Sequence, residues 1–400
     1  MVSVFILEQY DLAKPVSHFT KHPHSMKILL ISCLLLICIE ANAQSSNVLN
    51  TAVPFLLIAP DARATGMGNA GIATSPDVHS IFWNTSKLAF LQNQFGVSLS
   101  YTPWLHEVSS DFYLFDASSY WKIDSVNIIT ASFRYFHWEV ITFTNASGAI
   151  LGKFRPVEYT AHAGYARKFS KEFSAGINLG YVRSNLAEGF TVNNLPILPQ
   201  NALMADLSFL YSHSLKKQSD FRKYNFGIVI SNIGNKIGYT SNPEFRDFLP
   251  ANLGIGSAFD FQFGKQHEVS LALDLNKLLV PTPDSNEVYR SESVTEGIYR
   301  SFSDAPDGFG EEIRETTIST GAEYWFRQTI ALRTGYFYED KNKGDRQYLS
   351  FGAGVKYSFI QMDLSYWLST SANESPIDKT FHASISFNVN SFRKNPSKQS

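Results

Sequence analysis

Cysteine is nearly absent from this sequence. The 400 residues contain two, Cys33 and Cys38, and both lie in one apolar stretch near the start of the chain. That stretch has the features of a cleaved export signal, so we expect the mature chain to contain no cysteine. This excludes a disulfide framework, a cysteine-ligated zinc site and a thiol nucleophile. A large exported protein without disulfides needs another source of stability, which a closed, hydrogen-bonded β-barrel would supply.

The chain also lacks a large surplus of positive or negative charge. The formal net charge is −2, so we predict no nucleic-acid partner, because proteins that bind DNA or RNA carry a basic surplus. The mean hydropathy of the chain is close to neutral, which argues against a helical membrane protein. Phenylalanine and tyrosine, by contrast, are abundant, with 32 and 19 residues.

Sequence patterns typical of enzyme and metal sites are also missing. The seven histidines that follow the export signal show neither H-x-x-x-H nor H-E-x-x-H spacing, and no G-x-S-x-G motif occurs. We therefore predict no catalytic residues, no metal and no cofactor. One alternative stays open, because a Ser–His pair formed by residues from different strands of a barrel leaves no local motif.

The first residues of the chain look like targeting segments. Met26 and Lys27 are followed by the apolar run 28–39, and Ala41-Asn42-Ala43 then forms an A-x-A cleavage site before Gln44. We interpret 26–43 as a signal peptide and 1–25 as an upstream extension, with Met26 as the true start. The alternative is a membrane anchor, for which the apolar run is short, because about 20 residues are needed to span a bilayer.

From about Gln94 onward, apolar and polar residues alternate with a period of two. In 381–389, for example, Phe381, Ile385 and Phe387 alternate with Ser384 and Ser386. We expect fourteen such strands, near 94–101, 111–121, 127–136, 158–168, 173–184, 202–212, 221–232, 252–260, 267–276, 318–326, 330–338, 347–357, 361–368 and 381–388. An even number of strands, each of about the length that crosses the hydrocarbon, is typical of a single-chain bacterial barrel. The sequence therefore predicts an all-β fold, a transmembrane antiparallel β-barrel over 94–390.

The connections between these segments alternate in length. Short ones lie at 169–172, 262–266, 327–329 and 358–360, and long ones at 137–157, 185–201, 233–251 and 277–317. Outer-membrane barrels have short periplasmic turns and long external loops, whereas a soluble β-sandwich has no reason to alternate in this way. The polar loop 277–317 is interpreted either as a disordered surface loop or as a loop that docks a partner or acts as a lid. We expect 391–400 to be a disordered periplasmic tail.

The segment 44–93 has a different texture and precedes the first strand. It begins with apolar residues, breaks at Pro60 and contains Gly66, Gly68 and Gly71. Although these glycines match G-x-G-x-x-G, no βαβ unit surrounds them, so we interpret them as points where the chain turns tightly against other backbone. We predict that 44–93 is a hatch lodged in or under the barrel.

Several charges fall on the polar face of the expected strands, which is the lumen of a barrel. They are Arg134, Asp206, Asp274, Glu323, Arg333 and Asp363, with His162 and Lys356 in similar positions. Because both signs occur, a bracing network of ion pairs is one interpretation, and a polar path or ligand site is the other.

The hatch segment resembles the N-terminal signature of the PorV (LptO) family, outer-membrane proteins of the type IX secretion system in Bacteroidetes. The residues that carry the resemblance are Pro54, Phe55, Leu56, Leu57, Pro60, Asp61, Arg63, Gly66, Met67, Gly68, Gly71, Trp83 and Asn84. Thr65 and Thr85 depart from the pattern, since the family usually has glycine and proline there. The family is in turn similar to FadL-type fatty-acid transporters, which implies fourteen strands and an N-terminal hatch.

The resemblance implies a non-enzymatic shuttle. PorV-like proteins bind the C-terminal signal domain of secreted cargo as it leaves the large translocon barrel. They deliver it to the attachment complex of the PorU sortase with PorZ and PorQ, which links it to lipopolysaccharide in the outer-membrane lipid. We expect loops 137–157, 185–201, 233–251 and 277–317 to supply the cargo surface. Two alternatives stay open: a FadL-like transporter of hydrophobic compounds, and a barrel-type lipid hydrolase with a lipid-facing Ser–His pair.

Overall fold

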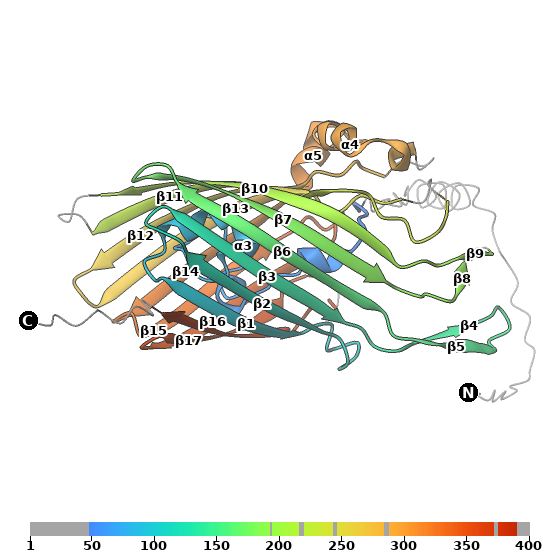
Figure 1. The fold of residues 1–400 in the computed structure, drawn as a ribbon, viewed down its shortest axis with the longest axis horizontal. Helices are drawn as coiled ribbons and strands as arrows, with labels where there is room; N and C mark the ends of the chain where they lie inside the picture. Colours follow the sequence, from blue (N-terminus) through green and yellow to red (C-terminus); the bar gives the residue numbers. More distant parts are fainter. Residues whose placement is uncertain are drawn as a thin grey trace, which may run out of the picture. The chain divides into compact units, whose positions relative to one another are not determined.

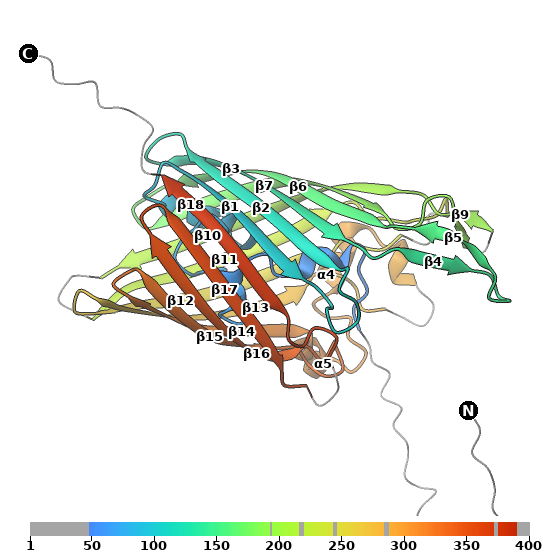
Figure 2. The same ribbon diagram turned by 90° about the horizontal axis from the view of Figure 1, so that it is seen from below.

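A closed antiparallel β-barrel forms the body of the protein (Figures 1 and 2). The computed structural model describes residues 48–192, 194–215, 220–242, 246–283, 288–371 and 375–389. The expected upstream extension, signal peptide and periplasmic tail lie outside these residues. The barrel strands are β1 (Phe95–Pro103), β2 (Tyr113–Lys122), β3 (Asn127–His137), β6 (Val157–Lys168), β7 (Phe173–Asn185), β10 (Gln200–Ser214), β11 (Phe221–Gly234), β12 (Asn252–Phe263), β13 (His267–Leu278), β14 (Thr316–Phe326), β15 (Ile330–Tyr338), β16 (Gln347–Tyr357), β17 (Ile360–Ser369) and β18 (Phe381–Val389).

Each barrel strand pairs with its neighbours in sequence, and the barrel is closed by the pairing of β1 with β18. The closing register places Phe95 opposite Val389 and Tyr101 opposite Ala383. All fourteen strands expected from the period-two pattern are present, so the predicted fold is confirmed. Closure leaves no unpaired edge in the barrel wall, which a membrane-spanning sheet requires because lipid offers no hydrogen-bond partners.

The two faces of the wall differ in polarity because successive side chains point to opposite sides. On β13, Leu271, Leu273 and Leu275 are exposed on the outer face, whereas Ala272 and Asp274 are buried inside. Apolar residues outside and polar residues inside are the arrangement that a barrel needs in lipid.

The connections alternate in length as expected. At one end the chain turns within 169–172, 264–266, 327–329 and 358–359. At the other end, two hairpins extend beyond the barrel: β4 (Ile141–Thr144) with β5 (Ile150–Phe154), and β8 (Thr191–Val192) with β9 (Leu195–Pro196) (right-hand side of Figure 1).

The connection between β13 and β14 contains η4 (Val288–Ser291), α4 (Val294–Arg300) and α5 (Phe309–Arg314). The interpretation of this loop as disordered is therefore wrong over 279–283 and 288–315. No helix in the described ranges is long and apolar enough to cross a membrane.

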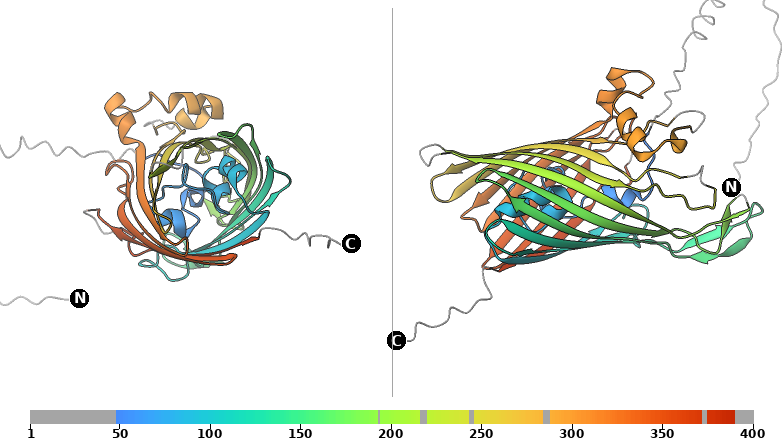
Figure 3. Two further views of the ribbon diagram at one scale, coloured as in Figure 1. Left: turned by 90° about the vertical axis from the view of Figure 1, so that its left-hand side faces the viewer. Right: turned by 45° about the horizontal axis from the view of Figure 1, so that its top comes forward.

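Residues 48–94, called the plug below, precede β1 and lie inside the barrel (Figure 3, left). Their helices are short: η1 (Pro54–Leu57), α2 (Ala62–Thr65), α3 (Ser80–Trp83) and η2 (Thr85–Phe90). Local capping sets where two of them begin. The Asp61 side chain accepts a hydrogen bond from the Ala64 amide at 2.9 Å at the start of α2, and the Asn84 side chain accepts one from the Ser86 amide at 3.1 Å at the start of η2.

Candidate functional site: the plugged lumen and the external rim

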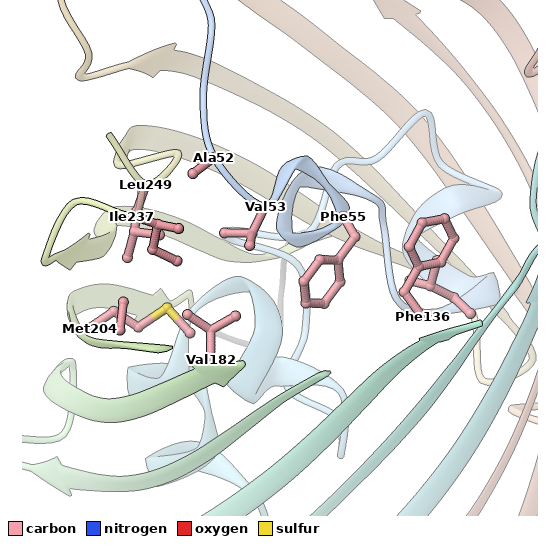
Figure 4. Packing of buried hydrophobic residues seen from close by; sticks show 10 residues of the cluster. Ala52, Val53, Phe55, Phe136, Val182, Met204, Ile237 and Leu249 are labelled. Atoms are coloured by element: carbon pink, nitrogen blue, oxygen red, sulfur yellow. The ribbon is translucent and has the colours of Figure 1, made fainter. Parts of the chain in front are cut away.

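The start of the plug packs into an apolar cluster below the external mouth. Val53 and Phe55 are buried there, and the Phe55 ring stacks on Phe136 of β3 with 6.1 Å between ring centroids. Figure 4 shows these side chains beside Val182 and Met204 of the wall. Side chains therefore fill the lumen beside η1.

A buried arginine ties the middle of the plug to the wall. Arg63 on α2 donates to both carboxylate oxygens of Glu323 on β14, from Nε at 2.9 Å and from Nη2 at 2.7 Å. Its Nη1 donates to Asp77 of the plug at 2.7 Å. Burial would lower the pKa of Arg63, but Glu323 and Asp77 outweigh it and raise that pKa well above its usual value. Such a two-point contact fixes orientation as well as charge.

The ion pairs continue along the wall beyond Glu323. Arg333 on β15 donates from Nε to Glu323 Oε2 at 2.6 Å, and its Nη1 lies 2.8 Å from Asp363 Oδ1 on β17. A chain of alternating charges thus runs from the plug across three strands.

The other partner of Arg63, Asp77 of the plug, is also ionised. Burial alone would raise the pKa of Asp77, but the positive charges of Arg63 and Lys87 outweigh it and lower that pKa to about 2.

The other expected lumen charges also hold the plug. Asp274 on β13 accepts hydrogen bonds from the backbone amides of Gly71 at 2.7 Å and Ile72 at 2.8 Å. Arg134 on β3 donates to the Ile58 carbonyl oxygen at 2.7 Å and pairs with Asp116 at 2.5 Å.

Asp206 is linked to the plug through another side chain of the wall. It accepts a hydrogen bond from the Asn178 side chain at 3.0 Å, and Asn178 in turn donates to the Ile81 carbonyl oxygen at 3.2 Å. Of the two further positions on the polar face, His162 is half-buried and Lys356 is exposed near the end of β16.

The glycine-rich turn touches the wall backbone directly. Gly68 has a φ of +66°, and a Cβ atom there would lie 2.6 Å from the Tyr336 amide nitrogen and 2.8 Å from the Thr320 carbonyl oxygen. A Cβ atom on Gly71 would lie 2.3 Å from the Trp83 ring. Glycine is required at both positions because no other side chain fits.

Trp83 and Asn84 hold the plug together on the other side of this turn. The Trp83 indole nitrogen donates to Asp61 Oδ2 at 2.6 Å. Asn84 donates to the carbonyl oxygen of Ile72 at 3.0 Å and to that of Phe209 on β10 at 3.1 Å. Of the six expected lumen charges, Arg134, Asp274 and Glu323 bond directly to the plug, whereas Asp206, Arg333 and Asp363 are linked to it through other side chains.

Comparison with known families decides what the chain belongs to. The model of the family described as "Type IX secretion system protein PorV" matches residues 41–285, more than half of the chain. The chain belongs to the PorV family. It is therefore a component of the type IX secretion system, and its barrel is that of an outer-membrane protein. No curated protein matches the chain.

Solved structures share the fold of this PorV-family chain at low identity. The CymD monoaromatic hydrocarbon channel is 13% identical, with a TM-score of 0.51 over 84% of this chain and 99% of its own. A deltaS2S3 mutant of the TodX monoaromatic hydrocarbon channel is 11% identical, with a TM-score of 0.50 over 82% of this chain and 98% of its own. These likenesses concern the fold alone, and they confirm the expected FadL-like barrel.

Both departures from the PorV pattern place a hydroxyl group against the wall. Thr65 Oγ1 lies 2.6 Å from Ser365 Oγ on β17, and Thr85 Oγ1 donates to Asn178 Oδ1 on β7 at 2.8 Å. Each threonine therefore adds a hydrogen bond between plug and wall that glycine or proline could not make.

A small cavity remains beside the central ion pairs. It has a volume of about 10 Å³ and is lined by residues that include Asp61, Arg63, Asp77 and Lys87. A space of this size holds about one water molecule. Burial lowers the pKa of Lys87 to about 8, and its ammonium group donates to the Gly71 carbonyl oxygen at 2.6 Å. This cavity is too small for an organic ligand.

Two hydroxyl–imidazole pairs lie in the lumen. Ser98 Oγ is 3.3 Å from His79 Nδ1, and Thr102 Oγ1 is 2.9 Å from His382 Nδ1, with all four residues buried. A lipid hydrolase would need such a pair on the lipid-facing side, so these pairs do not support that alternative. The described residues also contain no cluster of three or more potential metal ligands.

The external rim presents apolar side chains to water. The two hairpins contact each other through Phe143 and Phe190, whose ring centroids are 4.0 Å apart. Ile150 and Leu151 on β5 are 69% and 62% exposed. The β4–β5 hairpin was not predicted from the sequence. Residues 141–154 nevertheless have the pattern of a hairpin, because a polar turn that ends in glycine lies between two apolar segments.

Proposed function

We propose that this PorV-family protein is a non-enzymatic carrier that binds the C-terminal signal domain of secreted proteins on its external hairpins. It takes the cargo from the large translocon barrel to the attachment complex of the PorU sortase with PorZ and PorQ, where cargo is linked to lipopolysaccharide. The observation that carries the proposal is the contrast between a lumen sealed by buried ion pairs and a rim that exposes apolar strands.

The sealed lumen argues for work on the outside of the barrel. Arg63 and Glu323 are both buried, and breaking a buried pair by removing one partner costs about 3–5 kcal/mol. Opening the lumen would also break the hydrogen bonds of Asp274 and Arg134 with plug backbone. A carrier that uses its rim needs none of these contacts to break.

The β4–β5 hairpin has the properties of a docking surface for a β-rich domain. Within the described residues its two strands pair only with each other, so both outer edges offer free backbone groups. Edge pairing gives affinity through the main chain, and exposed side chains such as Ile150 and Leu151 add apolar contact. The signal domain of cargo is the partner that fits this surface.

Export through the signal peptide at 26–43 is part of the same proposal. The hatch would then be the first segment of the mature chain to reach the periplasm, ahead of the strands that surround it. The tail at 391–400 would stay in the periplasm.

The alternative function is transport of hydrophobic compounds, which the likeness to hydrocarbon channels favours at the level of the fold. The apolar cluster around Phe55 would be the entrance of such a path. It is filled by side chains, and the cavity deeper in the plug, at about 10 Å³, admits about one water. Transport would therefore require the plug to move.

The test is a pull-down of purified signal domain with the protein in detergent. We expect the double substitution Ile150→Asp and Leu151→Asp to weaken cargo binding by about tenfold or more, because each buried apolar anchor contributes on the order of 1 kcal/mol or more. The matched control is Val108→Asp, which alters an apolar residue of the β1–β2 loop that is 65% exposed. Unchanged binding by the double variant, or equal loss in the control, would contradict the proposed site.

A further inference from the structure

The helices α4 and α5 lie outside the barrel wall, beside the external ends of β13 and β14 (Figure 1 and Figure 3, left). They do not cover the mouth of the barrel in the end-on view. On its inner side, α4 contributes Val294 to an apolar cluster that includes Leu49 of the plug and Phe248.

The acidic residues of α5 point inward. Glu311 and Glu312 are 5% and 7% exposed. Lys343 Nζ lies 2.5 Å from Glu311 Oε1, and Lys277 Nζ lies 3.0 Å from Glu312 Oε2. Glu315, which follows the helix, pairs with Lys277 at 2.7 Å and with Lys343 at 3.0 Å. Both glutamates of the helix thus face the barrel, whereas Arg314 at its end pairs with the exposed Asp307.

The apolar residues of the same helix point outward. Phe309 is 79% exposed and Ile313 is 58% exposed, whereas α4 exposes the charged Glu296 and Arg300 beside Tyr299. A helix in contact with water has the opposite polarity, with its apolar stripe on the protein and its charges in solvent. The inversion indicates an apolar medium on the outer side of α5.

The lipid-facing surface of the barrel runs directly into this apolar face. The chain passes from α5 through Glu315 into β14, whose first outward apolar residue is Ile318. Ile318 pairs with Leu275 of β13, and both are exposed on the wall. Phe309 and Ile313 therefore extend an interface that the barrel already makes with lipid.

We propose that α4 and α5 form a foot that rests on the outer leaflet of the membrane, with Phe309 and Ile313 in the boundary between headgroups and acyl chains. Short amphipathic helices bind there with their apolar face about 5–10 Å deep, and aromatic residues are enriched at this level. The continuity with the lipid-facing wall selects lipid over a protein partner as the occupant. The foot sets how deeply the barrel sits in the membrane, whether or not the external hairpins bind cargo.

The test uses single cysteines in the full-length protein, in a background where Cys33 and Cys38 are replaced by serine. Phe309→Cys or Ile313→Cys is labelled with an environment-sensitive fluorophore, and the barrel is reconstituted into phosphatidylcholine vesicles with and without brominated acyl chains. The matched control is Ile150→Cys, on the external β4–β5 hairpin and 69% exposed. Resistance of the barrel to unfolding by detergent without heating verifies that each variant is folded.

We expect brominated lipid to quench the fluorescence of labels at positions 309 and 313, and aqueous iodide to leave it unchanged. The label at position 150 should be quenched by iodide and not by brominated lipid. Equal iodide quenching at 309 and 150 would overturn the proposal. So would a photo-crosslink from position 309 to a protein in native outer membranes together with no quenching by brominated lipid, because the inverted face would then be a protein interface.

Discussion

The plug and the external rim are both attached to the same barrel, but by opposite kinds of contact. Where the plug meets the wall, Arg63 and Glu323 are buried and joined by two hydrogen bonds. Where the two hairpins meet, aromatic rings stack while Ile150 and Leu151 remain in water. Charge is used where water is excluded and movement would be costly, and apolar surface is left where a partner can cover it.

The largest effect is expected from breaking the central ion pair. Arg63→Ala removes the cation that pairs with Asp77 and one of the two that pair with the buried Glu323, and should lower the free energy of unfolding by about 3–5 kcal/mol. Guanidinium unfolding in detergent micelles measures this loss, and ion conductance across planar bilayers reports whether the plug loosens. The control is His213→Ala, which removes the partly exposed contact of His213 with Glu172 and should cost at most about 1 kcal/mol. Equal losses of unfolding free energy in the two variants would show that burial does not raise the cost of removing such a contact.

A smaller effect is expected from the buried ammonium group of Lys87, whose pKa is lowered to about 8 from 10.5. Between these values the unfolded chain binds more protons than the folded chain, so stability should rise as the pH rises through this range. The total rise should be roughly 3 kcal/mol. Unfolding from pH 7 to pH 11 measures it, and the Lys87→Met variant should lack this rise. The same slope in both proteins would assign the effect to another group.

Asp274 tests the contact between the wall and the glycine-rich turn. Asp274→Ala leaves the amides of Gly71 and Ile72 without their acceptor and should cost about 1.5–3 kcal/mol, the usual value for hydrogen bonds to a charged group. Asp274→Asn keeps an acceptor oxygen and should recover part of this loss. An alanine variant as stable as the parent protein would mean that water replaces the carboxylate.

The smallest effect is expected at the rim. Phe190→Ala removes the ring that stacks on Phe143 and should destabilise the hairpins locally by about 1 kcal/mol. Hydrogen exchange should become faster in β4, β5, β8 and β9, while the unfolding midpoint of the barrel stays unchanged. A shift in that midpoint would show that the hairpins and the wall unfold together.

The barrel could be predicted from the sequence because its signal is local. A period of two repeats in every strand, and short turns make successive strands neighbours. One ion pair follows from this alone, since Glu323 and Arg333 lie opposite each other across the tight β14–β15 turn. The partners of Arg63 do not follow, because Glu323 lies 260 residues away in sequence and nothing local connects them.

The plug helices and the foot could not be predicted for a related reason. The plug helices η1, α2 and α3 have four residues each, too few to form without the wall that surrounds them. In 277–317 the abundant acidic residues suggested a solvated loop, yet Glu311, Glu312 and Glu315 pair with Lys277 on β13 and Lys343 in the β15–β16 loop. Composition gives the number of charges but not which of them meet.

The order of segments along the chain has a consequence for biogenesis. The plug is made first, but the central ion pairs that hold it need Glu323 on β14, Arg333 on β15 and Asp363 on β17, and the seam is completed only when β18 reaches β1. Until the last quarter of the polypeptide has been inserted, the plug lacks these ion pairs, although Arg134 on β3 and Asp274 on β13 already contact it. A barrel stalled before that point would leave an open conduit through the membrane, so sealing and maturation become a single event.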